Sequence, residues 1–173
     1  GASSVTGAGA AERGPACAGR VLMNRIGILT SGGDAPGLNA VIRAVVRTAN
    51  QAGHEVVGIA DGYDGVLAGR SRVLGGEDVH GILALGGTIL GAANRGNLLR
   101  RKVVQEGAEV VTHALDAFMA AFARLEIDAL IVVGGDGSLR IAREVFERGL
   151  PVVGVPKTID NDLGGTDVTF GFD

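Results

Sequence analysis

The tripeptide Gly-Gly-Asp occurs twice in this chain, at 32–34 and at 134–136, and each copy closely follows a short apolar run. An amphipathic stretch follows each copy, at 39–50 and at 139–148, with apolar residues at helical spacing. Short buried strands, glycine-rich turns and helices in alternation are typical of α/β proteins with a mainly parallel sheet. The sequence therefore predicts this fold class, with helices on both faces of the sheet.

The remaining apolar and amphipathic segments predict the other elements of this fold. The predicted strands are 25–30, 55–60, 129–133 and 152–155. A further amphipathic helix is expected at 108–125, whereas 61–107 holds many glycines and only weak, short strand signals. This succession gives one α/β unit and contains no internal repeat.

The first 24 residues differ in composition from the rest of the chain. They are rich in Gly, Ala and Ser and lack periodicity, so 1–24 is expected to be a disordered or artefactual tail. Met23 stands immediately before the first predicted strand, and our hypothesis is that it is the natural start of translation. The folded part is therefore expected to cover 25–173.

Composition excludes several classes of protein. No run of about 18 to 20 apolar residues occurs, so a transmembrane helix is not expected. The net charge of −3 argues against a nucleic-acid surface, and the single Cys17 leaves no disulfide framework. We therefore expect a cytoplasmic protein that binds neither membrane nor nucleic acid.

Three loops that follow predicted strands, at 31–39, 134–138 and 156–162, are expected to converge on one cleft. Loops after parallel strands share the carboxyl edge of the sheet, where ligands of α/β proteins bind. Glycines let backbone N–H groups approach anionic oxygens, and a helix N-terminus adds partial positive charge. The first two loops therefore favour phosphate binding, although a tight strand–helix turn would also explain the glycines of 134–138.

Asp34 and Asp136 place carboxylates where phosphates are expected. A bridging Mg²⁺ would remove the repulsion, because magnesium in nucleotide sites is held by one or two carboxylates together with phosphate oxygens. For Asp34 an N-cap role at the helix that follows is an equally good interpretation.

The third loop carries groups suited to proton transfer and charge neutralisation. If the segment is extended, Thr158, Asp160 and Asp162 alternate onto one side, and one carboxylate can take a proton from an alcohol. Lys157 supplies a cation for a transferring phosphoryl group. An Asx-turn with solvated acids is the alternative. Together the three loops predict a magnesium-dependent phosphoryl-transfer site.

Several segments in register from about Ile26 to Asp173 resemble the 6-phosphofructokinase family. They are IGILTSGGDAPGLNAVIRAVVR, GGTILGAANRGN, IDALIVVGGDGS, VPKTIDND and the closing TFGFD. The resemblance implies a phosphofructokinase-like three-layer α/β fold, with the active site between two similar domains. It also implies the glycolytic transfer of the γ-phosphoryl group of ATP to the 1-hydroxyl of fructose 6-phosphate, with Mg²⁺, in an allosteric homo-oligomer, either a dimer or a tetramer.

The resemblance also assigns roles to individual residues. Donor-nucleotide contacts fall on Gly33, Tyr63 (near the adenine), Arg95, Gly96, Gly135, Asp136, Gly137 and Ser138. Sugar-phosphate contacts fall on Thr158, Ile159 and Asp160, and magnesium positions on Asp136 and Asp162. Asp160 corresponds to the base that deprotonates the attacking hydroxyl, with Lys157 and Thr158 as further catalytic residues. Arg43, Arg47 and Arg70 match effector-binding positions, or else Arg43 and Arg47 form a solvated helix face.

Two residues give opposite indications of the phosphoryl donor. In the family, a glycine at the position of Gly137 is found in ATP users, whereas a lysine at the position of Lys157 is found in pyrophosphate users. We favour ATP, because Gly137 has no side chain that would crowd the α-phosphate of the donor, and we take this to be the stronger determinant. Pyrophosphate is the alternative.

The chain is shorter than members of this family and lacks their later sugar-phosphate residues. We therefore expect this segment alone to be a poor catalyst or inactive, and a non-catalytic nucleotide-binding fragment is the alternative of another class. NAD kinases and lipid kinases share a GGDG loop but lack the SGGDxPG opening and the PKTIDND loop.

Overall fold

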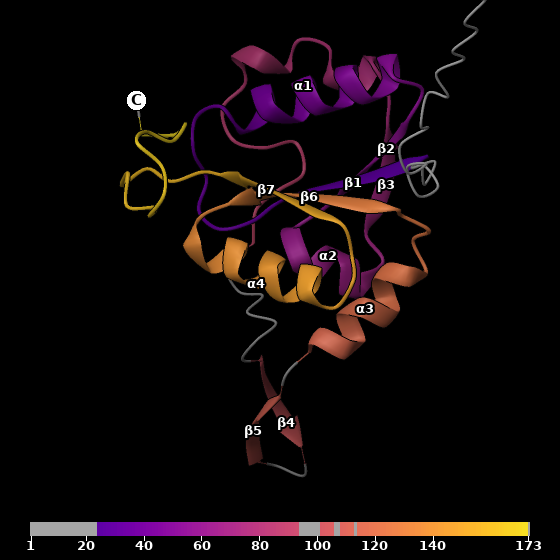
Figure 1. Ribbon diagram of the computed structural model, residues 1–173, viewed down its shortest axis with the longest axis vertical. Coiled ribbons are helices and arrows are strands. Elements are labelled where there is room, and N and C mark those ends of the chain that lie inside the picture. The colour runs from indigo at the N-terminus through magenta and orange to yellow at the C-terminus, as the bar shows by residue number, and fades with distance from the viewer. Residues whose placement is uncertain (1–23, 94–100, 106–107, 113, 173) are drawn as a thin grey trace, which may run out of the picture.

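A five-stranded sheet lies between two layers of helices in the computed structural model (Figure 1), which describes residues 24–93, 101–105, 108–112 and 114–172. The strand order is β3-β2-β1-β6-β7. The strands are β3 Ser71–Leu74, β2 Glu55–Ile59, β1 Arg25–Thr30, β6 Ala129–Gly134 and β7 Val152–Pro156. All neighbours pair in parallel except β3, which is antiparallel to β2. The predicted α/β class and mainly parallel sheet are therefore confirmed.

Helix α1 covers one face of the sheet, and three helices cover the other (Figure 1). The helices are α1 Leu38–Gln51, α2 Gly62–Ala68, α3 Leu115–Ala123 and α4 Asp136–Glu147. Two short 3₁₀ turns, η1 Glu77–Val79 and η2 Ile82–Ala84, lie along α1. The two helical layers confirm the prediction that both faces of the sheet are covered.

Alternation along the central strands divides the core into two clusters. Ile28 faces α1, whereas the next residue, Leu29, faces the opposite helical layer, and both are fully buried. On α1 the predicted apolar face is confirmed by Ile42 and Val46, which are fully buried against the sheet. β1 is therefore apolar on both faces, as a central parallel strand requires.

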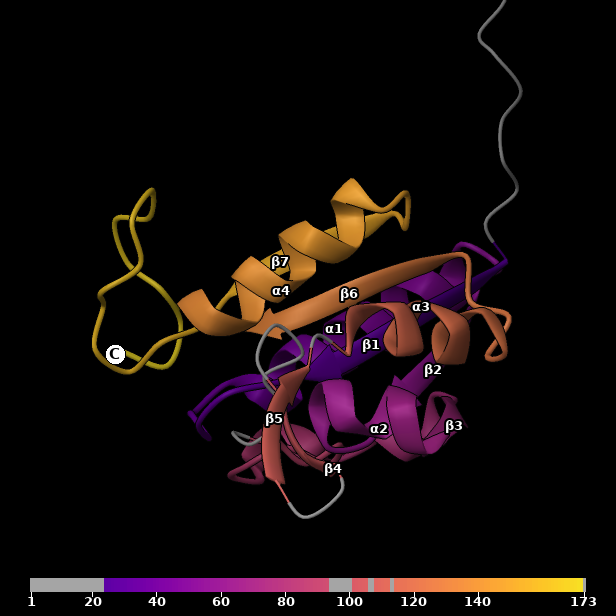
Figure 2. The ribbon, with the colours of Figure 1, turned by 90° about the horizontal axis from the view of Figure 1, so that it is seen from below.

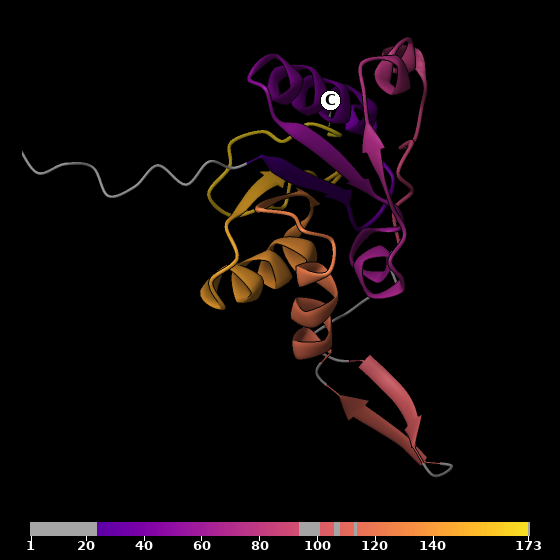
Figure 3. The same cartoon turned by 90° about the vertical axis from the view of Figure 1, so that its right-hand side faces the viewer.

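The prediction of one helix over 108–125 is wrong in its first part. Ala108–Thr112 is strand β5, which pairs antiparallel with β4 Arg101–Gln105, and α3 begins only at Leu115. The segment AEVVT ends in three consecutive β-branched residues, which favour a strand over a helix. Figure 3 shows this pair of strands extending away from the central sheet.

The N-terminal tail predicted at 1–24 lies almost wholly outside the described residues.

The carboxyl ends of β1, β6 and β7 meet at one edge of the sheet. Thr30 is opposite Val133 in the β1–β6 pair, and Val133 is opposite Val155 in the β6–β7 pair. Figure 2 shows the segment after β7 lying at the end toward which the β6 arrow points. The loops that follow these three strands are thereby brought together.

Candidate active site

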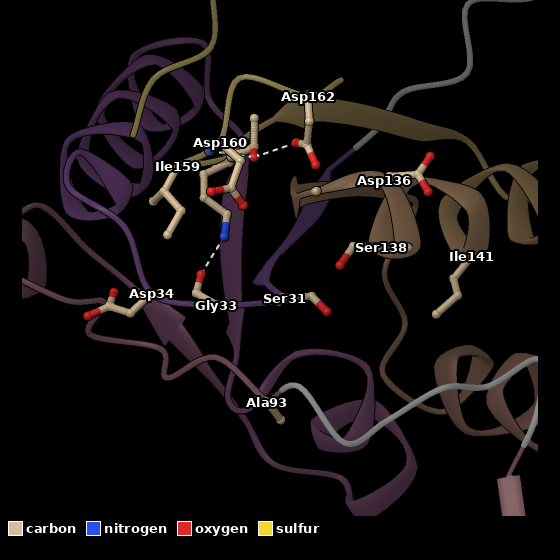
Figure 4. A pocket seen from close by; sticks show the side chains of 15 residues that line it. Ser31, Gly33, Asp34, Ala93, Asp136, Ser138, Ile141, Ile159, Asp160 and Asp162 are labelled. Atoms are coloured by element: carbon tan, nitrogen blue, oxygen red, sulfur yellow. Dashed lines mark hydrogen bonds between the residues drawn. The ribbon is translucent and has the colours of Figure 1, made fainter. Parts of the chain in front are cut away.

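A cleft of about 430 Å³ lies where the three predicted loops converge (Figure 4). Its lining residues are Ser31, Gly32, Gly33, Asp34, Ala93, Gly135, Asp136, Gly137, Ser138, Ile141, Lys157, Thr158, Ile159, Asp160 and Asp162. Most of the residues that the sequence nominated therefore share one cavity, although the loops lie far apart along the chain.

Lys157 joins the first and third loops. Lys157 is only 4% exposed, and its Nζ donates a hydrogen bond to the carbonyl of Gly33. Its backbone N–H also donates to the carbonyl of Gly134, with 3.0 Å between N and O. Burial lowers the pKa of Lys157 below the usual range, while the charge of Asp34 acts in the opposite direction. Lys157 thus places a largely buried amine between the loops at the floor of the cleft.

The second loop presents the N-terminus of α4 to the cleft. Gly135 is the N-cap residue and Asp136 is already the first residue of the helix. The first-turn N–H groups of a helix lack partners within the helix and carry partial positive charge. Because Gly135, Asp136, Gly137 and Ser138 line the cleft, this end of α4 is suited to bind an anion.

The helix expected after the first loop is confirmed, but it does not repeat this arrangement. α1 begins at Leu38, four residues after Asp34, and its N-cap Gly37 has a φ of 92°, which no right-handed helical residue adopts. No side chain of the described part of the chain caps α1, and the Asp34 carboxylate accepts a hydrogen bond from the backbone N–H of Ala35 instead. The interpretation of Asp34 as a helix N-cap is therefore wrong.

The third loop turns and does not continue as an extended segment, so the predicted alternation is wrong. The Thr158 hydroxyl accepts a hydrogen bond from the backbone N–H of Asp160 at 3.1 Å and donates one to Asp162 at 2.8 Å. Asn161 has a φ of 50°, and its side chain binds the backbone of two later residues in the loop. Short polar side chains compete in this way with extended backbone. The turn still leaves Asp160 and Asp162 in the lining of the cleft.

The carboxylates of the cleft fit a magnesium ion that is shared with a phosphate ligand. Asp136 and Asp162 are both exposed in the lining, and Asp136 forms an ion pair with Arg140 at 3.0 Å. Within the described part of the chain, no three His, Cys, Asp or Glu side chains gather into a metal cage. One or two carboxylates suffice for Mg²⁺ when phosphate oxygens and water complete its shell.

Tyr63 lies beneath the cleft and is not part of its lining. Tyr63 is only 2% exposed, and its hydroxyl donates a hydrogen bond of 2.7 Å to the carbonyl of Ser138. Burial also raises the pKa of Tyr63 well above its usual range. Tyr63, which was expected near an adenine base, is therefore a buried side chain whose hydroxyl is bonded to a backbone carbonyl of α4.

Arg95 and Gly96 lie outside the described residues. Arg70 forms an ion pair with Asp61 at 3.2 Å, and Arg47 is exposed on α1. The three arginines that were matched to effector positions do not line this cleft.

Among the helices that the structure describes, none is long and apolar enough to cross a membrane.

Sequence reasoning missed two apolar lining residues, Ala93 and Ile141. Ile141 is buried on α4, three positions after Ser138, and therefore lies on the same side of the helix one turn later. Extending the helical periodicity from the glycine loop would have identified it. Ala93 forms an isolated bridge with Ser31, and no local pattern marks that pairing.

Known proteins share both the sequence and the fold. An ATP-dependent 6-phosphofructokinase of Chloroflexus aggregans is 54% identical over 153 residues, which cover 86% of this chain and 41% of that protein. A pyrophosphate–fructose 6-phosphate 1-phosphotransferase of Amycolatopsis methanolica is 51% identical over 150 residues, with 86% and 41% covered. The chain therefore spans about two fifths of the length of these relatives.

A solved structure supports the same relationship. The crystal structure of Pichia pastoris phosphofructokinase in the T-state superposes with a TM-score of 0.73 at 36% identity, covering 87% of this chain and 17% of the other. The family described as Phosphofructokinase matches residues 25–173. Because this match covers all five strands of the central sheet and all three loops of the cleft, the chain belongs to the phosphofructokinase family.

Proposed function

We propose that the cleft is the donor side of a 6-phosphofructokinase active site. The protein that contains it would transfer the γ-phosphoryl group of ATP to the 1-hydroxyl of fructose 6-phosphate, giving fructose 1,6-bisphosphate and ADP. The observation that carries the proposal is the placement of the α4 N-terminus and Lys157 in one cavity with the Asp160 and Asp162 carboxylates. This combination supplies positive charge for phosphates and a base for the acceptor alcohol.

Each side of the cleft has a distinct task in this proposal. Gly33 and the first turn of α4, through the N–H groups at 135–138, bind the donor phosphates. Asp160 accepts the proton of the acceptor hydroxyl, while Thr158 and Ile159 help to hold the sugar phosphate. Asp136 and Asp162 would hold Mg²⁺, which neutralises charge on the phosphates when it is bound. Arg95 and Gly96 are assigned to the donor by family resemblance alone.

ATP is the proposed donor. A side chain at position 137 would stand beside the donor phosphates, and no atom of the described residues lies within 4 Å of a Cβ placed on Gly137. Lys157 is the residue that favours pyrophosphate, and relatives named for each donor are similar to this chain at 54% and 51% identity. A pyrophosphate-dependent enzyme is therefore the second candidate.

The proposal extends to the setting of the whole protein. We place it in glycolysis, in the cytoplasm, as a homo-oligomer with fructose 6-phosphate and ATP as its ligands. The chain spans 41% of relatives with these activities, so residues 25–173 alone are expected to bind nucleotide without efficient turnover.

The test is a donor comparison on the purified full-length protein that contains this chain. Formation of fructose 1,6-bisphosphate is followed with Mg-ATP and, separately, with magnesium pyrophosphate. We expect the faster reaction with ATP. Turnover at least tenfold faster with pyrophosphate would reverse the donor assignment, and no product from either donor would refute the proposed function.

Asp160→Asn tests the proton acceptor within this proposal. Loss of general-base catalysis should lower kcat about 10²- to 10⁴-fold, while ATP binding is retained. Asp167→Asn is the matched control, because Asp167 is an exposed aspartate in the segment that follows this loop and does not line the cleft. Equal kcat values for wild type and Asp160→Asn would remove Asp160 from the reaction.

A further inference from the structure

Tyr63 connects three helices on one face of the sheet. It is the second residue of α2, and its ring meets that of Phe118 on α3 edge to face, with 5.7 Å between the ring centroids. Its hydroxyl reaches α4, where it donates to the Ser138 carbonyl at 2.7 Å, a contact that is buried. The side chain is therefore fixed at both its ring and its hydroxyl.

The acceptor of this hydrogen bond belongs to the helical turn that lines the cleft. Ser138 is the third residue of α4, and Gly135, Asp136, Gly137 and Ser138 all line the cavity. A backbone carbonyl has two lone pairs, so it can accept the bond from Tyr63 in addition to a bond within the helix. A restraint on this carbonyl therefore restrains the direction of the first-turn N–H groups.

We propose that Tyr63 is a positioning residue, which orients the α4 N-terminus toward the donor phosphates through the Ser138 carbonyl and makes no contact with the base. This inference rests on the proposed function, because it concerns the same donor site. Burial also keeps the hydroxyl protonated across the working pH range, since it raises the pKa of Tyr63 well above its usual value.

The proposal distinguishes phosphate from base. A residue that orients the phosphate-binding turn affects every donor that carries a polyphosphate group. A residue that contacts adenine affects only ligands that carry the base. Mg-ATP and magnesium tripolyphosphate therefore separate the two roles, because the second ligand has phosphates and no base.

The experiment measures the dissociation constants of both ligands for the full-length protein and for Tyr63→Phe. The substitution keeps the buried ring and removes only the hydroxyl. We expect both dissociation constants to rise by the same factor, roughly three- to tenfold, which corresponds to the net value of one hydrogen bond. The donor KM should rise with them, while kcat changes less.

Phe122→Leu is the matched control for a merely structural effect. Phe122 is buried in the same cluster and stacks on Phe118, and it has no hydrogen-bonding group. We expect this variant to lower the midpoint of thermal unfolding at least as much as Tyr63→Phe does, with both dissociation constants unchanged.

Two results for the variants would overturn the inference. Weaker binding of ATP with unchanged binding of tripolyphosphate would show that the Tyr63 hydroxyl acts on the nucleoside. Unchanged binding of both ligands in Tyr63→Phe would show that the hydrogen bond does not orient the helix. If the wild-type protein bound neither ligand, the proposed function itself would fail, and the inference with it.

Discussion

The two Gly-Gly-Asp loops begin alike and end differently. Both follow neighbouring parallel strands, and Thr30 and Val133 are opposite each other in the pair that precedes them. In the second loop Asp136 is the first residue of α4, whereas in the first loop α1 begins four residues after Asp34. Only the second loop therefore presents a helix N-terminus to the cleft.

The residues after each Gly-Gly-Asp explain this difference. The first loop continues with Ala-Pro-Gly, and Gly37 has a left-handed φ of 92° that no helical residue can adopt. The second continues with Gly-Ser, and both residues are already helical. The same tripeptide thus makes a spacer in one loop and a helix start in the other. The glycine and aspartate predictions below test whether the loops also differ in their tasks, and the last prediction concerns Lys157, which joins them.

The largest expected effect comes from adding a methyl group to a glycine at each loop. A Cβ on Gly134 would lie 2.6 Å from the Ser138 Cβ and 2.9 Å from the Ser31 carbonyl oxygen, so Gly134→Ala forces the two loops apart. We expect it to lower the free energy of unfolding by about 1–3 kcal/mol. Denaturant titration measures this loss.

Gly33→Ala is the counterpart in the first loop. Among the residues that the structure describes, no atom lies within 4 Å of a Cβ placed on Gly33, so the free energy of unfolding should change by less than about 0.5 kcal/mol. Donor binding should still weaken, because the methyl group points into open space in the cleft lining. Equal destabilisation by the two substitutions would contradict this distinction.

A smaller effect is expected from the two aspartates. Asp136→Asn should weaken magnesium-dependent ATP binding about tenfold, within the range seen when groups around a bound metal are changed. Asp34→Asn should have less effect, since Figure 4 shows Asp34 at the lower left of the view, away from Asp136 at its right and Asp162 at its top. ATP titration with and without Mg²⁺ measures both. A larger magnesium-dependent loss in Asp34→Asn would move the ion to the first loop.

The smallest effect concerns Lys157, which binds backbone carbonyls of both loops. Its pKa in the folded protein is lowered by burial, so the unfolded chain holds more protons between that pKa and the usual 10.5. Over this window the free energy of unfolding gains a contribution that rises with pH. In Lys157→Met that contribution should vanish, with stability at neutral pH within about 1 kcal/mol of wild type.

Urea titrations of both proteins from pH 7 to pH 10.5 measure this difference. Subtracting the two curves removes the titration of all other groups that the substitution leaves unchanged. A difference that stays constant over the whole range would mean that burial does not perturb Lys157.

Much of this arrangement was predictable from local pattern. The strands before both Gly-Gly-Asp loops, the buried face of α1 and the convergence of three loops follow from apolar runs and from the geometry of parallel sheets. The roles of individual cleft residues remain predictions, because they depend on ligands and on residues beyond the described chain.

The predictions that were wrong concern segments where a local preference or a side-chain hydrogen bond opposes the structure that apolar periodicity predicts. At 108–112 consecutive β-branched residues outweighed a helical pattern, and at 158–162 the Thr158 hydroxyl replaced extended backbone by a turn. The burial of Tyr63 required a partner 75 residues away in the chain, which no local window contains.

The central position of β1 has a consequence for synthesis on the ribosome. β2 follows β1 out of the exit tunnel after α1 alone, whereas β6, the other neighbour of β1, follows only after the whole segment between Ile59 and Ala129. During that interval one side of β1 exposes unpaired N–H and C=O groups, which is the geometry that recruits strands from other chains. The nascent polypeptide is therefore prone to aggregate until β6 emerges, and a holding chaperone would have its greatest effect on yield during that interval.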